Sequence, residues 1–194
     1  MINIDYKELI GAALGFTAVW LATRQNAFYW VLSMFSVLLY SFVLFEHKLY
    51  SDTILHIVYF LFSIYGFYLW TRKKEGKIIL HVSTLTFNEL LVWVLIITGC
   101  SVLLGFIFDN FTDAHAPYID NFCTSASLVG TYWQSKKKIE NWPLWVVVNI
   151  TYIFLYIHRG LYISSLLYLL YVVLAIIGWR NWFVSLIEDR KIRS

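Results

Sequence analysis

Charged residues are scarce in this sequence. Only 14% of its 194 residues are Asp, Glu, Lys or Arg, whereas 60% are hydrophobic. A soluble domain usually carries about 25% charged residues. Several apolar runs also approach the roughly 20 residues that cross a bilayer. These features exclude a soluble globular domain of this size and predict an integral membrane protein with several spans and no separate soluble domain.

Cysteines are also few, and residues that could do chemistry do not cluster. Cys100 and Cys123 both fall in apolar segments, without metal-ligand spacing. The sequence contains no phosphate-binding loop, and its five histidines are scattered. The apolar runs hold no chain of carboxylates for a proton relay. The N-terminus lacks the basic start of a signal peptide. We therefore expect no enzymatic activity, no cofactor, no metal and no nucleic-acid partner.

The apolar runs are long and unbroken, which favours helices over the alternating strands of a membrane barrel. One of the two prolines, Pro143, falls in the first turn of an expected helix, where a missing N–H costs little. We predict an all-α integral membrane protein. Its seven transmembrane helices are expected at residues 8–22, 27–45, 50–70, 89–108, 118–134, 142–158 and 161–184.

Basic residues concentrate on one side of this arrangement. With loops assigned alternately to two sides, twelve Lys and Arg residues share a side with the C-terminus and three share a side with the N-terminus. The positive-inside rule then places the C-terminus in the cytoplasm and the N-terminus outside, in a bacterial inner membrane. The outer side is acidic, which would favour a cationic solute unless outer loops simply avoid Lys and Arg.

Two stretches of the chain are similar to each other. Asn26, Trp30, Leu49, Tyr50, Gly66 and Trp70 match Asn141, Trp145, Leu161, Tyr162, Gly178 and Trp182. The Asn and Trp30–Trp145 pairs are offset by 115 residues and the others by 112. Duplicated membrane units build many transporters, with the substrate site between the halves. We predict parallel three-helix repeats at 1–70 and 118–184, a loop and linker helix at 71–117, and a cytoplasmic tail at 185–194.

This three-one-three plan resembles the SWEET-type sugar transporters, but the residues resemble the PnuC-type vitamin transporter family more closely. The string Glu140-Asn-Trp-x-x-Trp-x-x-x-Asn149 is similar to the strongest motif of that family. Gly160-Leu-Tyr162 and Gly178-Trp-Arg-Asn-Trp182 follow it, and the first half adds Leu49-Tyr50 and residues 64–70. Together these segments extend over most of the chain.

The resemblance implies uptake of a cationic aromatic B vitamin, nicotinamide riboside or thiamine, by facilitated diffusion with alternating access. It also implies trapping by a cytosolic kinase that phosphorylates the vitamin. A sugar carrier is the hardest alternative to separate, because sugars also stack on Trp. A small-solute channel is a further alternative, although no filter-like loop is present. Small transporters of this plan often associate, so a homo-oligomer is possible in the bilayer.

Tryptophan and tyrosine suit such a substrate, because a cationic aromatic ring can stack on them. Trp142 and Trp145, three residues apart, share one helix face. Asn149 lies on the same face one turn further, where a buried amide needs a partner. We predict that these three residues bind substrate, although Trp at a membrane interface needs no function. Trp30 is the repeat counterpart of Trp145, whereas Met34 matches Asn149, so a site here is asymmetric.

Three more candidates lie on one face of the third helix, namely His56, Tyr59 and Ser63. Ionisable residues within a membrane are candidates for function, but a hydrogen-bonded His can equally be structural. In nicotinamide riboside transporters the resemblance implies amide side chains around positions 56 and 63. His and Ser at these positions favour thiamine slightly.

The remaining aromatic and acidic candidates differ in their expected roles. Asp120 opens a helix on the outer side, where it could cap the helix or meet a cationic substrate. Tyr152 and Tyr168 could line the cavity. Trp70 and Trp182 end helices beside basic loops, so we expect them to be interface anchors rather than binding residues.

Overall fold

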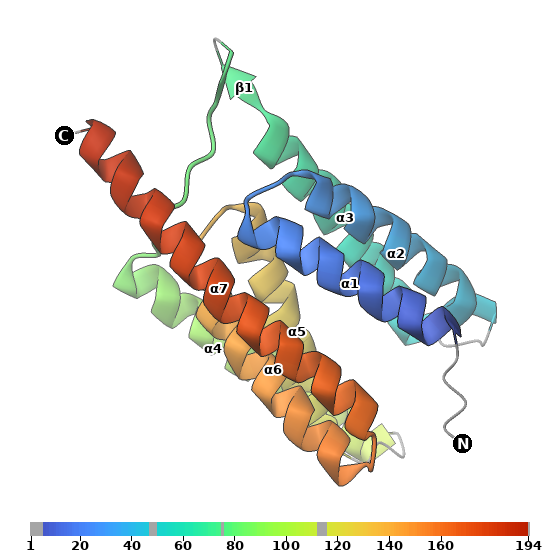
Figure 1. Ribbon diagram of the computed structural model, residues 1–194. Coiled ribbons are helices and arrows are strands. Elements are labelled where there is room, and N and C mark those ends of the chain that lie inside the picture. Colours follow the sequence, from blue (N-terminus) through green and yellow to red (C-terminus); the bar gives the residue numbers. More distant parts are fainter. Residues whose placement is uncertain (1–5, 47–49, 75, 112–115, 194) are drawn as a thin grey trace. The chain divides into compact units, whose positions relative to one another are not determined.

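The computed structural model describes residues 6–46, 50–74, 76–111 and 116–193 (Figure 1). In that part of the chain the elements are α1 (Tyr6–Thr23), α2 (Phe28–Glu46), α3 (Tyr50–Thr71), β1 (Lys73–Lys74), β2 (Lys77–Ile78), α4 (Phe87–Phe111), α5 (Pro117–Ser135), α6 (Asn141–His158) and α7 (Tyr162–Arg193). The predicted all-α fold with seven helices is confirmed, and Pro143 lies in the first turn of α6.

The seventh helix is longer than expected. It continues to Arg193, through residues that the sequence analysis assigned to a tail. Leu186 is buried one turn beyond the buried Trp182, so the apolar face of α7 extends past the predicted end at residue 184. The charged residues that suggested a tail lie on the last turns of this helix.

Among the described residues, three helices are long and apolar enough to cross a membrane by length and composition. Their spans are Ile54–Thr71, Phe87–Phe111 and Tyr162–Lys191. The helix α4 illustrates why these surfaces suit lipid, because Leu95, Leu103 and Phe111 are all largely exposed. A row of exposed apolar side chains on one helix is unfavourable in water and favourable against acyl chains.

A short hairpin interrupts the helical pattern after α3. The strand β1 pairs antiparallel with β2, with Lys73 opposite Ile78. Gly76 adopts a φ of 77° in the connection, a backbone conformation that glycine tolerates best. Only a loop was predicted here from the sequence.

The chain forms two compact units. The first comprises Met1–Val82, Ser135–Lys137 and Ile177–Ser194, and the second comprises Ser83–Gln134 and Lys138–Ile176. Within the first unit, α2 packs against α1 and α3. These units follow spatial contacts, whereas the repeats follow sequence similarity, so the predicted repeat limits remain a prediction.

The core of the second unit joins α4 to the helices of the second repeat. Ile97 of α4 packs with Ala126, Val129 and Trp133 of α5 and with Val148 of α6. From the sequence, α4 was expected to be only a linker between the repeats. In the structure it is part of the hydrophobic core that supports α5 and α6.

The first helix of each repeat ends in the same kind of turn. Gln25 and Lys137 both have a left-handed backbone, with φ of 55° and 51°. In each copy the next residue donates its N–H to the carbonyl five residues earlier, at 3.0 Å after Gln25 and 2.8 Å after Lys137. This pattern is a common helix C-terminal motif. The two turns are 112 residues apart, which aligns them between the repeats.

The turn alignment locates three extra residues in the second copy. Asn26 follows Gln25 directly, whereas Lys138, Ile139 and Glu140 separate the turn at Lys137 from the matching Asn141. This insertion explains why the Asn and Trp pairs are offset by 115 residues and the turns by 112.

Candidate functional site

The indole of Trp145 is held in a fixed orientation within the second unit. Its Nε1 donates a hydrogen bond to Oε1 of the buried Gln134, at 3.2 Å. The ring lies close to Gly130 of α5, where an added Cβ would be 3.3 Å from the Trp145 Cε2 atom. A glycine and an amide on α5 therefore position the half-buried tryptophan of α6.

Polar and aromatic side chains continue along α6 from Trp145. Asn149, one turn further, is buried with 6% of its surface exposed. Beyond it the Tyr152 ring lies 4.8 Å from the Tyr168 ring of α7, measured between centroids. Tyr156 stacks on Tyr168 at 5.2 Å. Trp142 is almost fully buried in the first turn of α6. The predicted α6 candidates thus lie in one aromatic region that contains a buried amide.

The helix α4 supports this region through aromatic contacts with α5. The ring of Trp93 lies 5.2 Å from the Tyr132 ring and meets Trp133 edge-on at 6.3 Å. Trp93, Trp145 and Tyr152 all pack against the same buried core. Displacement of α4 would therefore disturb the surroundings of Trp145.

Buried polar residues on two faces of α5 were not predicted from the sequence. Asn121 and Ser125 lie on one face, and Ser127, Thr131 and Gln134 lie on another. Asn121 and Thr131 bond to carbonyls of their own helix, at 2.8 Å each. Gln134 bonds instead to Trp145 of α6. The signal was present in the sequence, because the polar residues within each of these two groups are three or four residues apart in an apolar run.

Asp120 forms an ion pair at the other end of α5. Its Oδ2 atom lies 3.3 Å from Nη2 of Arg159, and both side chains are about 40% exposed. An exposed pair of this kind contributes little to stability. The nearby guanidinium offsets the negative charge that Asp120 would offer to a cationic solute.

The other predicted residues lie in the first unit. Ser63 is buried and donates its hydroxyl to the Tyr59 carbonyl of the same helix, at 2.8 Å. The His56 and Tyr59 rings meet edge-on at 6.3 Å. Of the ten predicted site residues, these three and Trp30 belong to the first unit and the other six to the second.

Trp70 and Trp182 are not interface anchors, contrary to the sequence-based prediction. They are 2% and 0% exposed, and their rings lie 5.8 Å apart. Trp70 Nε1 donates to the Ser135 carbonyl at 3.2 Å, and Trp182 Nε1 donates to the Ala22 carbonyl at 3.1 Å. Each indole thus donates a hydrogen bond to a carbonyl near the C-terminal end of another helix. Burial and these bonds make both residues part of the core.

Trp30 completes this tryptophan cluster. It is fully buried, and its ring meets Trp70 edge-on at 5.6 Å. Its Nε1 has no hydrogen-bond partner among the described residues. Trp145 by contrast is half-buried and hydrogen-bonded, so the two repeat-related tryptophans have different surroundings.

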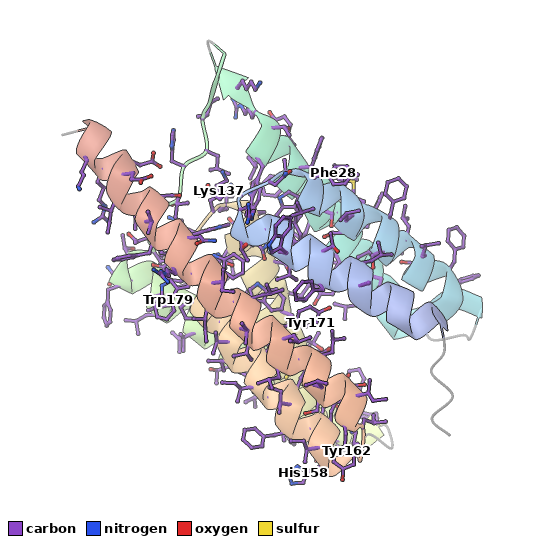
Figure 2. All side chains as sticks on the ribbon, viewed as in Figure 1. Phe28, Lys137, His158, Tyr162, Tyr171 and Trp179 are labelled. Carbon is purple, nitrogen blue, oxygen red and sulfur yellow. The ribbon has the colours of Figure 1, made fainter. Side chains whose placement is uncertain are left out.

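Other aromatic residues have the exposure expected of lipid or interface contacts. Phe28, Tyr162 and Trp179, labelled in Figure 2, are 53%, 70% and 46% exposed. Trp179 lies only three residues before the buried Trp182, so the anchor prediction selected the wrong face of α7.

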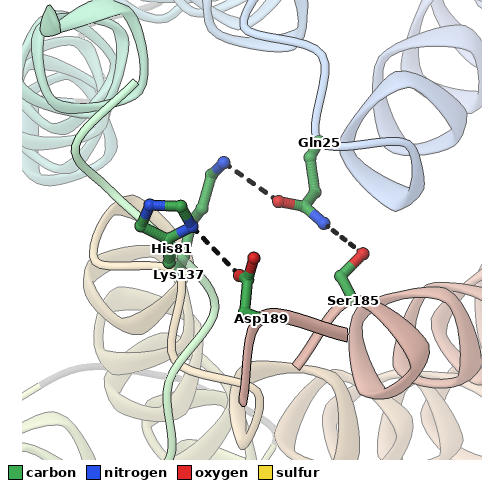
Figure 3. A network of polar contacts seen from close by, with 5 residues as sticks. All are labelled: Gln25, His81, Lys137, Ser185 and Asp189. Atoms are coloured by element: carbon green, nitrogen blue, oxygen red, sulfur yellow. Dashed lines mark hydrogen bonds and ion pairs between the residues drawn. The ribbon is translucent and has the colours of Figure 1, made fainter. Parts of the chain in front are cut away.

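A polar network surrounds the turn at Lys137 in the first unit (Figure 3). The Lys137 ammonium donates to Oε1 of Gln25, and Nε2 of that glutamine donates to Oγ of Ser185, both at 3.0 Å. Nδ1 of His81 lies 3.0 Å from Oδ2 of Asp189. The ammonium also lies 5.0 Å from the centre of the Trp70 ring. These contacts attach the C-terminal half of α7 to the turns after α1 and α5.

Burial lowers the pKa of Lys137 from 10.5 to about 8, and the charge of Asp189 partly opposes this shift. Between pH 8 and 10.5 the folded protein has therefore lost a proton that the unfolded chain still binds. We expect stability to rise across this window and to fall as pH decreases through about 8. Thermal unfolding in a nonionic detergent, followed by tryptophan fluorescence, measures this rise.

The matched control is the neighbouring lysine. Lys136 belongs to the same turn, and its ammonium lies 5.0 Å from the Tyr65 ring centre. Lys137→Met should flatten the rise with pH, whereas Lys136→Met should retain it. Equal slopes in wild type and both variants would contradict the lowered pKa of Lys137.

Within the described residues, no group of three or more His, Cys, Asp or Glu side chains could hold a metal ion. The candidate residues of α6 carry aromatic rings and an amide, which are groups that can bind and orient a solute.

Comparison with known protein families shows which family has this sequence. The family model described as nicotinamide mononucleotide transporter matches residues 5–184. The chain belongs to this family. It is therefore a membrane transporter and not an enzyme, and the resemblance to PnuC-type transporters is confirmed.

Individual members of the family are similar over most of their length. The nicotinamide riboside transporter PnuC of Escherichia coli is 24% identical, covering 94% of this chain and 87% of the relative. The riboflavin/roseoflavin transporter RibM of Streptomyces davaonensis is 22% identical, covering 97% and 90%. A crystal structure of the vitamin B3 transporter PnuC matches with a TM-score of 0.68 at 22% identity, covering 90% of this chain and 79% of that one. The fold is thus shared.

Proposed function

We propose that this transporter takes up a B vitamin with an aromatic heterocycle, by facilitated diffusion with alternating access. One observation supports this proposal most directly. On one face of α6, the oriented indole of Trp145 and the buried amide of Asn149 lie one turn apart. Family membership and the names of the relatives support a vitamin as the substrate class. The proposed direction is inward, with the N-terminus outside and a cytosolic kinase trapping the product.

The chemistry of the site fits a flat ring joined to a polar group. The Gln134 bond fixes the Trp145 ring, so a heterocycle can stack on it without first ordering the side chain. A positive charge on that heterocycle adds a cation–π attraction. Asn149 offers a donor and an acceptor to a ribose hydroxyl or a pyrimidine edge. Tyr152 and Tyr168 extend the aromatic surface.

Thiamine and nicotinamide riboside both meet these requirements. His56 and Ser63 are our reason for favouring thiamine slightly. Ser63 gives its only hydroxyl proton to its own helix, so it can only accept a bond from a ligand. We assign Trp30 to the tryptophan cluster of the first unit, because it is fully buried there. A homo-oligomer in the inner membrane remains part of the proposal.

Calorimetric titration of the detergent-purified protein tests the proposal. Thiamine, nicotinamide riboside and riboflavin are titrated separately, with glucose and sucrose as controls for a sugar carrier. We expect saturable binding of at least one vitamin and of neither sugar. Binding of thiamine alone would support the inference that His56 and Ser63 favour thiamine. Binding of nicotinamide riboside alone would contradict that inference. Binding of a sugar without any vitamin would overturn the proposed function.

A further inference from the structure

The three extra residues of the second repeat all bond to the segment that leads into α4. Ile139 N donates to the Ser83 carbonyl at 3.0 Å, and Lys138 and Ser83 form a parallel bridge. The Lys138 ammonium donates to the Thr84 carbonyl at 3.0 Å. Leu85 N donates to Oε1 of Glu140 at 2.9 Å. Three successive residues thus pair with three successive residues.

Glu140 makes an unusual contact for its position. It immediately precedes α6, where a side chain often caps the first backbone N–H groups of its own helix. The Glu140 carboxylate makes no such bond. It reaches instead to the backbone of Leu85, whose side chain packs against the core that also contacts Trp145.

The second carboxylate oxygen of Glu140 indicates that burying this side chain has a free-energy cost for folding. Oε2 of Glu140 is buried and has no hydrogen-bond partner among the described residues. A partly satisfied buried carboxylate is less favourable for folding than an apolar side chain of similar volume. The bond from Leu85 N to Oε1 is therefore the favourable part of this contact.

We propose that Glu140 is a positioning residue for vitamin binding: it fixes the first turn of α6 to the segment before α4 and so sets the placement of Trp142 and Trp145. The first repeat lacks these three residues, and its Trp30 is enclosed by other aromatic side chains. The insertion thus distinguishes the start of α6 from the start of its repeat counterpart α2. This inference rests on the proposed function, because it assumes that α6 contacts the vitamin.

The test compares Glu140→Ala and Glu140→Gln with Glu89→Ala. Glutamine keeps a carbonyl oxygen that can accept from Leu85 N, and alanine does not. Glu89 is the matched control, because its carboxylate also accepts a backbone N–H, that of Thr86 at 2.7 Å, at the start of a different helix. Vitamin affinity is measured by titration with the vitamin that wild type binds. Amide hydrogen exchange of residues 83–87 and 141–146 is measured without vitamin.

We expect Glu140→Ala to weaken affinity about tenfold, the size of effect that loss of a charge-assisted hydrogen bond can have. Exchange should accelerate at Leu85 and in the first turn of α6. Glu140→Gln should restore most of both, and Glu89→Ala should leave affinity and the α6 exchange unchanged. Faster exchange with unchanged affinity would reduce Glu140 to a structural residue and overturn the proposal.

Unchanged exchange in Glu140→Ala would overturn it as well, without any vitamin being present. If the wild-type protein bound none of the three vitamins, that result would instead refute the proposed function. The exchange measurement thus separates failure of the positioning role from failure of the substrate assignment.

Discussion

Gly66→Ala is expected to destabilise the protein severely. A Cβ at this position of α3 would overlap the Cε2, Cζ2 and Cδ2 atoms of the Trp30 indole. That ring is fully buried and is held by Trp70 and Tyr29, so it has no free space to enter. Overpacking a core usually costs about 1–3 kcal/mol and occasionally more. We expect a loss at the upper end of that range, measured as a lower apparent unfolding temperature in detergent at a fixed heating rate.

The control for this substitution is Gly99→Ala. An added Cβ there meets no atom within 4 Å, and alanine favours a helix by roughly 0.5–1 kcal/mol over glycine. Gly99→Ala should therefore be neutral or slightly stabilising. Replacing Trp30 by Leu in the Gly66→Ala background should recover part of the loss by removing the overlapping ring atoms. A Gly66→Ala protein as stable as wild type would show that Trp30 can move.

Trp145→Ala is expected to cause the largest loss of vitamin affinity. Stacking of a heterocyclic base on an aromatic side chain contributes about 1–3 kcal/mol, which corresponds to about tenfold to a hundredfold in the dissociation constant. Asn149→Ala should also weaken binding, because the ligand would lose a hydrogen-bonding amide at a buried position. Calorimetric titration measures both effects, and an unfolding scan shows whether each variant remains folded.

Two further substitutions make the result specific. Trp145→Phe keeps an aromatic face but loses the Nε1–H that binds Gln134, so we expect a smaller loss than for alanine. Trp179→Ala removes an exposed tryptophan of α7 and should leave affinity unchanged. Wild-type affinity in both Trp145→Ala and Asn149→Ala would remove these residues from the site.

Local patterns predicted the helices well, because helix position depends on apolar run length and on nearby start signals. At the start of α4, Thr86 and Glu89 form reciprocal hydrogen bonds, with Thr86 N donating to Glu89 Oε2 at 2.7 Å and Glu89 N to Thr86 Oγ1 at 3.3 Å. The predicted end of α7 was wrong because the last turns of this helix are charged on one face while Leu186 remains buried on the other. The composition of a segment combines all faces of a helix, so it does not show that one face is charged while another is buried.

The candidate site was predicted only in part. Trp145 and Asn149 share a helix face by spacing alone, so the sequence placed them together correctly. Gln134 was missed because its role depends on α5 and α6 packing closely at Gly130. Trp70 and Trp182 were misassigned because tryptophan near basic residues suits either an interface or a core, and only tertiary contacts distinguish the two.

Sequence alone determined that this chain is an all-helical membrane protein of the transporter family, because hydrophobicity, repeat spacing and the α6 motif are properties of residues in order. Tertiary structure alone decided that Trp30 is enclosed while Trp145 is partly accessible, and that Glu140 binds the segment before α4. Burial and long-range hydrogen bonds depend on which residues meet after folding. Two matching sequence repeats can therefore give tryptophans with different surroundings.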